Sequence, residues 1–127
     1  MEKDAPALPS GKEALEEILD SQLSAVTFVM DYVQFEFHGP RLTAVTWPTV
    51  LVGDRLFRLG DPGYRDELCA RIAKKVTSIE VRPDAIVIAV DDAARVAISL
   101  RAEDLLGRGA ESAIFDGKCL VAFRPGE

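Results

Sequence analysis

Hydrophobic and polar residues alternate with a period of two along most of the chain, the pattern of half-buried β-strands. Strands are predicted at roughly 24–30, 32–38, 41–47, 49–52, 55–59, 76–82, 85–90 and 96–101. A last hairpin is predicted in SAIFDGKCLVAF, with a two-residue turn at Asp116-Gly117. The chain is therefore expected to be rich in antiparallel strands.

The first departure from this alternation lies near the amino terminus. Residues 1–10 have no periodicity and are predicted to form a flexible tail. Ser10 stands three residues before Glu13, the arrangement of a capping box. Apolar residues then recur at helical spacing as far as Leu19, which predicts a helix of about two and a half turns.

A second helix is predicted in GDPGYRDELCARIAKK. Asp61 is a suitable N-cap, and Pro62 suits the first helical position. Tyr64, Leu68 and Ile72 share one face, which we expect to be buried. A short helical turn is also predicted at 102–106.

The two halves of the chain have similar patterns. A shift of 53 residues aligns Asp31 with Asp84 and superimposes the apolar positions around them. This indicates either a duplication or two units that share a helix-plus-meander pattern without common ancestry. The predicted fold class is α+β: one antiparallel β-sheet built from two similar halves, with helices packed on one face. The predicted domain spans 11–124, with halves at about 11–59 and 61–123.

The segment DYVQFEFHGPRLTAVTW predicts a hairpin that turns at Gly39-Pro40. This register places Phe37 opposite Leu42 on the core face and Tyr32 opposite Trp47 on the outer face. The candidate binding residues are those of the outer face: Tyr32, Gln34, Glu36, His38 and Trp47. An ordinary half-solvated hairpin has the same pattern, so the functional interpretation competes with a purely structural one.

The strand AIVIAV at 85–90 is apolar on both faces, which predicts a central strand covered on both sides. Pairing Ile88 with Ile98 keeps its apolar face continuous and requires a five-residue loop from Asp91 to Arg95.

The chain has 127 residues and a net charge of −6. This charge disfavours nucleic acid and anionic membranes as partners and favours a basic protein. The amino terminus resembles no targeting signal, and no apolar run reaches the length of a membrane span, so a cytoplasmic location is expected. Cys69 and Cys119 are predicted to be buried thiols in a reducing compartment, with a disulfide left open.

No pattern of catalytic or metal-binding residues is present. Glu36 and His38 point the same way on a strand, but two ligands are too few for zinc and the chain has no second histidine. No nucleophile elbow is found, and SGKE lacks the earlier glycine of a phosphate-binding loop. We therefore predict no cofactor, no metal and no catalytic residue, and the sequence favours a protein that is not an enzyme.

Three stretches, VTFVMDYVQFEFHGPRLTAVTWP, LGDPGYRDELCARIAKKVT and ESAIFDGKCLVAF, are similar to an uncharacterised family of small acidic bacterial proteins. Some of its members are immunity-protein-like. The resemblance covers most of 18–123 and brings no functional residues with it. It implies a bacterial cytoplasmic protein that neutralises a partner by binding.

The leading hypothesis is thus a non-catalytic protein-binding module, an immunity- or antitoxin-like inhibitor. One alternative is a small-molecule-binding domain or enzyme with a cleft between the two halves. Another is a homo-oligomer, such as a homodimer, that uses the 85–90 strand as a contact.

Overall fold

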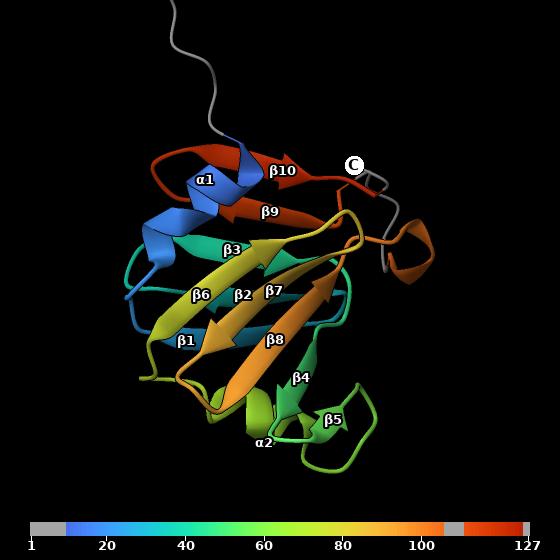
Figure 1. Ribbon diagram of the computed structural model, residues 1–127. Coiled ribbons are helices and arrows are strands. Elements are labelled where there is room, and N and C mark those ends of the chain that lie inside the picture. The colour runs from blue at the N-terminus through green and yellow to red at the C-terminus, as the bar shows by residue number, and fades with distance from the viewer. Residues whose placement is uncertain (1–9, 106–110, 126–127) are drawn as a thin grey trace, which may run out of the picture.

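The computed structural model describes residues 10–105 and 111–125, so the predicted tail lies outside the described residues except for Ser10. Ten strands in these ranges form two five-stranded antiparallel sheets that face each other (Figure 1). Sheet 1 has the order β1 (Ala25–Val29), β2 (Tyr32–Glu36), β3 (Arg41–Ala44), β9 (Ala113–Asp116) and β10 (Leu120–Phe123). Sheet 2 has the order β5 (Arg55–Phe57), β4 (Thr49–Val52), β8 (Ala94–Ser99), β7 (Ala85–Val90) and β6 (Val76–Val81).

The helices are short and lie at opposite ends of the molecule. The elements are α1 (Gly11–Leu15), its 3₁₀ continuation η1 (Glu16–Ile18), α2 (Tyr64–Cys69) and the 3₁₀ turn η2 (Ala102–Asp104). In Figure 1, α1 lies beside β9 and β10, while α2 lies below β4 and β8. None of the helices in the described ranges is long and apolar enough to cross a membrane.

The predicted α+β fold is therefore correct in its antiparallel strands but not in its layers. The two sheets cover each other, and no helical layer covers one face of a single sheet, so the molecule is mainly β. The reason is length: helices of six residues or fewer, extended by one 3₁₀ turn, cannot cover a five-stranded sheet.

The two helix starts differ from each other. The capping box of α1 is confirmed, with Glu13 N donating to Ser10 Oγ at 3.1 Å and Ser10 N donating to Glu13 Oε1 at 2.8 Å. The predicted cap of α2 is wrong. Gly63, with a φ of 85°, is the N-cap, and the Asp61 carboxylate accepts from Arg58 N at 2.8 Å. Asp61 thus closes a turn before the helix.

The end of the second helix is also shorter than predicted. Because α2 stops at Cys69, Ile72 does not continue its buried face and is 38% exposed. Arg71 is buried in that region instead, with its guanidinium 3.5 Å from the Glu67 carboxylate.

Each half of the chain contributes a three-stranded meander to one sheet and a hairpin to the other. Strand β3 pairs with β9, and β8 pairs with β4, so the hairpin β4–β5 joins sheet 2 and the hairpin β9–β10 joins sheet 1. The halves are therefore interlocked through both sheets. This exchange cannot be read from a sequence pattern, since it depends on pairings between distant strands.

Equivalent positions in the two halves share unusual backbone conformations. Among the described residues, those other than glycine with positive φ are Asp20 (66°), His38 (56°), Ala73 (76°) and Asp91 (59°). These form two pairs separated by 53 residues, the shift found in the sequence. Only a repeated local geometry accounts for two such pairs, because residues with a Cβ rarely adopt this region. The common ancestry of the halves stays a prediction.

The same repetition appears where the two segments after the helices cross. Asp20 N donates to Val76 O at 2.9 Å, and Ala73 N donates to Leu23 O at 2.7 Å. Each bond is the counterpart of the other under the shift of 53. The crossing therefore ties the two halves together symmetrically.

The β2–β3 and β7–β8 hairpins are each shifted in register by two positions from the prediction. Strand β2 pairs with β3 so that Glu36 faces Arg41, and Phe37 N donates to Pro40 O at 2.8 Å. The turn is at His38-Gly39, where both residues have positive φ, as a type I′ hairpin turn requires. Because the slip is two residues, the side chains stay on the predicted faces.

The β7–β8 hairpin is shifted in register by two residues in the same way. Ile88 faces Val96 instead of Ile98, and the loop is reduced to 91–93. In the last hairpin, Asp116 remains paired with Leu120, so the loop has three residues and not the predicted two. Strand β7 lies between β8 and β6 as expected for a central strand, but its outer side chains are only half-buried.

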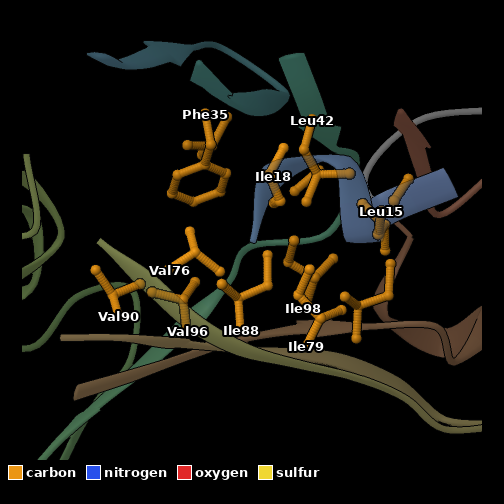
Figure 2. Close-up of a cluster of buried hydrophobic side chains, with 14 of the residues drawn as sticks. Leu15, Ile18, Phe35, Leu42, Val76, Ile79, Ile88, Val90, Val96 and Ile98 are labelled. Carbon is orange, nitrogen blue, oxygen red and sulfur yellow. The ribbon is translucent and has the colours of Figure 1, made fainter. Parts of the chain in front are cut away.

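The space between the two sheets is filled by apolar side chains (Figure 2). Phe35 and Leu42 descend from sheet 1 toward Ile88 and Ile98 of sheet 2, and Ile18 of η1 lies between them. Ile18, Leu42 and Ile98 have no exposed surface. Apolar side chains from both sheets and from η1 therefore form one shared core.

Candidate functional site

The structure places the predicted binding residues on two different parts of the surface. Tyr32, Gln34 and Glu36 are half-buried on the outer face of β2, and His38 is exposed at the following turn. Trp47 lies in the segment that joins β3 to β4 and packs partly against the core.

The predicted pair of Tyr32 with Trp47 is wrong. The β2–β3 ladder ends with Val33 opposite Ala44, so its continuation would place Val45 beside Tyr32. The two-residue slip of the hairpin causes this change.

The outer face of sheet 1 has long polar side chains on β2 and β3 and apolar ones, Ile114 and the exposed Leu120, on β9 and β10. Glu36, Arg41 and Asp116 stand side by side on β2, β3 and β9, with alternating charge. In the next row, Gln34 Nε2 donates to Thr43 Oγ1 at 3.3 Å. These residues form a polar, solvent-facing surface of the type that antiparallel sheets commonly expose.

Sheet 2 has small residues at the corresponding places. The row that matches Glu36–Arg41–Asp116 begins with Ala89 and continues with Arg95 and Leu51. The floor of this face is lined by Ser78, Ala85, Ala89, Ala97 and Ser99. Two concavities result, of about 290 Å³ beside the β7–β8 turn and about 600 Å³ beside Trp47.

The larger concavity, here called the Trp47 concavity, has two unlike walls. Trp47 and Arg58 come from the segments flanking β4 and β5, while Asp84, Arg101 and Asp104 come from the opposite side. Because Thr49 pairs with Ala97, continuation of that ladder places Trp47 beside Ser99. Trp47 thus lines the same concavity as Ser99, the residue that anchors the acidic wall.

The acidic wall is built around one serine. Ser99 Oγ donates to Asp104 Oδ2 at 2.6 Å and accepts from Arg101 N at 3.1 Å. Arg101 also pairs with the Glu103 carboxylate. These bonds order the turn η2 and direct its charged groups toward the concavity.

The charges on this wall influence one another. The hydrogen bond from Arg101 lowers the pKa of the Glu103 carboxyl, and the bond to Glu103 raises the pKa of the Arg101 guanidinium. The charges of Asp104 and Asp84 raise the pKa of Arg101 further. Three carboxylates therefore surround one guanidinium, and the wall has an excess of negative charge.

Arginine side chains stack on two aromatic rings among the described residues, but not on the indole of Trp47. The cation–π contacts of the described residues place Arg55 over Phe57 at 4.8 Å and Arg65 over Phe28 at 5.6 Å. None of the described guanidiniums lies over the Trp47 ring.

The described residues do not assemble a group of three or more His, Cys, Asp or Glu side chains suited to a metal ion. His38 sits at an exposed turn, where its backbone N donates to Ser24 Oγ at 3.0 Å. Cys69 is exposed and Cys119 half-buried, and both are free thiols, so the predicted burial of Cys69 is wrong.

Sequence reasoning missed the acidic wall and Arg58. The acidic wall lies on the same concavity as Trp47 because β4 pairs with β8, a contact between the two halves of the chain, while Arg58 is placed there by the β4–β5 hairpin. One available signal was the pair of alanines in AIVIAV, Ala85 and Ala89, which share the outer face of that strand with Val87.

No family model, curated protein or solved structure matches the chain. Membership in the family of small acidic bacterial proteins therefore stays a prediction.

Proposed function

We propose that the protein is a non-catalytic protein-binding module that holds its partner on the outer face of sheet 2, around Trp47. Its concrete form is an immunity- or antitoxin-like inhibitor that binds a basic protein in the bacterial cytoplasm. Surface complementarity between an acidic inhibitor and a basic target speeds association and disfavours wrong partners.

The observation that carries the proposal is the position of the chain's one tryptophan. Trp47 borders a concavity of about 600 Å³ whose floor includes the small side chains of Ala85, Ala97 and Ser99. Tryptophan is enriched among the residues that dominate binding energy, especially where a partner can exclude water around it. A flat floor of Ala and Ser lets a partner approach the backbone closely.

The charge of the chain supports a basic partner. The net charge is −6, and Asp84, Glu103 and Asp104 all border the Trp47 concavity. Association with a basic protein should therefore weaken as salt screens these charges.

A small-molecule ligand is the second candidate. The volume of the Trp47 concavity lies in the range of about 300–1,000 Å³ typical of ligand sites. Such a ligand would sit on the outer face of sheet 2, since apolar side chains fill the space between the sheets. It would raise the melting temperature of the protein, because any ligand of the native state stabilises it.

The test is affinity capture from a lysate of the source organism at low and moderate salt, followed by reconstitution with the purified partner. Trp47→Ala should weaken the reconstituted complex by about 1–2 kcal/mol, measured by calorimetry. Tyr32→Ala on sheet 1 is the matched aromatic control and should bind like the wild type.

An unchanged affinity in Trp47→Ala would contradict the proposal, as would failure to recover any specific partner at either salt. A rise in melting temperature with a metabolite in place of a protein partner would favour the second candidate. A strictly monomeric mass in dilute solution would exclude the homo-oligomer.

A further inference from the structure

We propose that the Trp47 concavity accepts an arginine side chain of the partner, with the guanidinium stacked on the indole of Trp47 and hydrogen-bonded to Asp104. This inference rests on the proposed function and names the chemical group that the site recognises.

The first argument is the proximity of an aromatic ring and a carboxylate. Continuation of the β4–β8 ladder places Trp47 beside Ser99, and Ser99 Oγ holds Asp104 Oδ2 at 2.6 Å. Trp47 and Asp104 line the same concavity, and the bond to Ser99 holds the Asp104 carboxylate within it. A cation over the ring and a carboxylate at its edge is a favourable arrangement for a guanidinium.

The second argument is the unused acceptor capacity of the wall. Asp104 engages Ser99 through Oδ2, and its Oδ1 accepts no hydrogen bond from the described residues. The Asp84 side chain likewise has no hydrogen bond in the described ranges, although its backbone O accepts from Leu100 N at 2.8 Å. Glu103, by contrast, is occupied by Arg101. Both carboxylates thus keep acceptor oxygens that accept no hydrogen bond from the described residues, although Asp84 lies within the field of Arg82 and Arg101.

The third argument is charge. Asp84, Glu103 and Asp104 surround Arg101, so this wall has two negative charges in excess. An incoming cation reduces the repulsion among these carboxylates, whereas an incoming anion increases it. Arg58 on the opposite wall is the group that would favour an anionic ligand. The experiment must therefore include an anionic probe.

Arginine fits this site better than lysine. A guanidinium is planar, so it can stack on an indole while its edge donates two parallel hydrogen bonds to a carboxylate. The floor beneath the ring is formed by Ala97 and Ser99, whose small side chains leave room for a flat group. An ammonium group could reach the carboxylates but would not stack.

The site contains its own reporter, because Trp47 is the chain's only tryptophan. The probes are capped peptides Gly-Ser-Xaa-Gly, in which Xaa is Arg, citrulline, Lys or Glu. Binding is followed by Trp47 fluorescence and by the indole N–H resonance. The arginine peptide should bind at least about fivefold more tightly than its uncharged citrulline counterpart, since a charged donor strengthens both the stacking and the hydrogen bonds.

Two variants locate the carboxylate. Asp104→Asn keeps an acceptor for Ser99 but removes the charge, and it should weaken the arginine peptide about tenfold. Asp116→Asn on sheet 1 changes the net charge equally, is exposed, and should leave the affinity unchanged.

Equal binding of the arginine and citrulline peptides, equal binding of the lysine peptide, or tighter binding of the glutamate peptide would overturn the inference. So would an unchanged affinity in Asp104→Asn or the absence of any response at Trp47. If Trp47→Ala still weakens the complex with the partner in these cases, the proposed function is retained and only the arginine inference fails. If Trp47→Ala retains the partner, the proposed function fails, whatever the peptides show.

Discussion

Each sheet combines the three-stranded meander of one half of the chain with the hairpin of the other half, in the same order. The outer faces of the two sheets nevertheless differ. Sheet 1 presents Glu36 and Thr43 where sheet 2 presents Ala89 and Ala97. The central rows of the first face have the longer polar side chains, while the second face borders two concavities.

This difference shows which positions the fold constrains. Side chains between the sheets must fill one shared core, so both inner faces are apolar and tightly buried. The outer faces contribute little to that core and can vary without changing the topology. The proposed function accordingly uses the hollow face, with Trp47 at its border.

The largest expected effect tests whether the buried helix residues of the two halves contribute equally to stability. Leu15 and Leu68 are 53 residues apart, and neither has exposed surface. Each change to alanine should reduce the free energy of unfolding by about 2–5 kcal/mol, because it removes buried methyl groups and leaves a cavity. Chemical denaturation measures both losses.

Met30→Ala is the control for these two variants, since Met30 is 89% exposed and should change stability by less than about 0.5 kcal/mol. A neutral effect of either leucine variant would mean that the two helices do not have equivalent roles.

The helix starts distinguish the halves. Gly11 opens α1 because a Cβ there would collide with the Phe123 ring, whereas Tyr64 opens α2 with its own buried ring. The Tyr64 hydroxyl donates to Pro48 O. Burial raises the pKa of Tyr64 from its usual 10.0 to about 12, against a smaller lowering by Arg65. The folded state therefore holds this proton more tightly than the unfolded state.

Because the pKa is raised on folding, the contribution of Tyr64 is complete below pH 10 and is lost as the pH rises toward about 12. The loss should approach about 2 kcal/mol, and Tyr64→Phe should abolish it. At neutral pH the same variant should be less stable by about 1 kcal/mol through the lost hydrogen bond. Parallel alkaline slopes for both proteins, in denaturation from about pH 9 upward, would contradict this account.

A smaller effect tests the repetition at the hairpin tips. Ser24 Oγ donates to Glu36 O at 3.0 Å, and the equivalent Thr77 Oγ1 donates to Asp91 O at 2.9 Å, with Ala89 O a second acceptor at 3.3 Å. Ser24→Ala and Thr77→Val should each lower the free energy of unfolding by about 1 kcal/mol, as measured by urea denaturation. Ser78→Ala removes a neighbouring exposed hydroxyl and should be close to neutral. A clear loss in only one of the two hydroxyl variants would show that the halves are not matched here.

Much of the strand pattern could be predicted from the sequence, because alternation reports which side chains face the core. Faces were assigned correctly even where the register was wrong, since both meander hairpins slipped by two residues. His38 and Asp91 caused these errors. A positive φ is less predictable at a histidine or an aspartate than at a glycine. The positions of the β2–β3 and β7–β8 turns could therefore not be predicted.

The candidate site was predicted only in part. Trp47 was selected, but its neighbours depend on the pairing of β4 with β8, which joins distant segments. Local patterns contain no information on such pairings. The same limitation led to the prediction of one sheet covered by helices in place of two sheets that cover each other.

The most direct test of the account uses one matched pair of substitutions. Ala97 on sheet 2 and Thr43 on sheet 1 occupy corresponding places, each beside the central row of its sheet. Ala97→Leu should fill the Trp47 concavity and weaken the purified partner at least about tenfold, while Thr43→Leu should leave the affinity unchanged. Loss of binding in Thr43→Leu with retention in Ala97→Leu would contradict the claim that sheet 2 is the binding face.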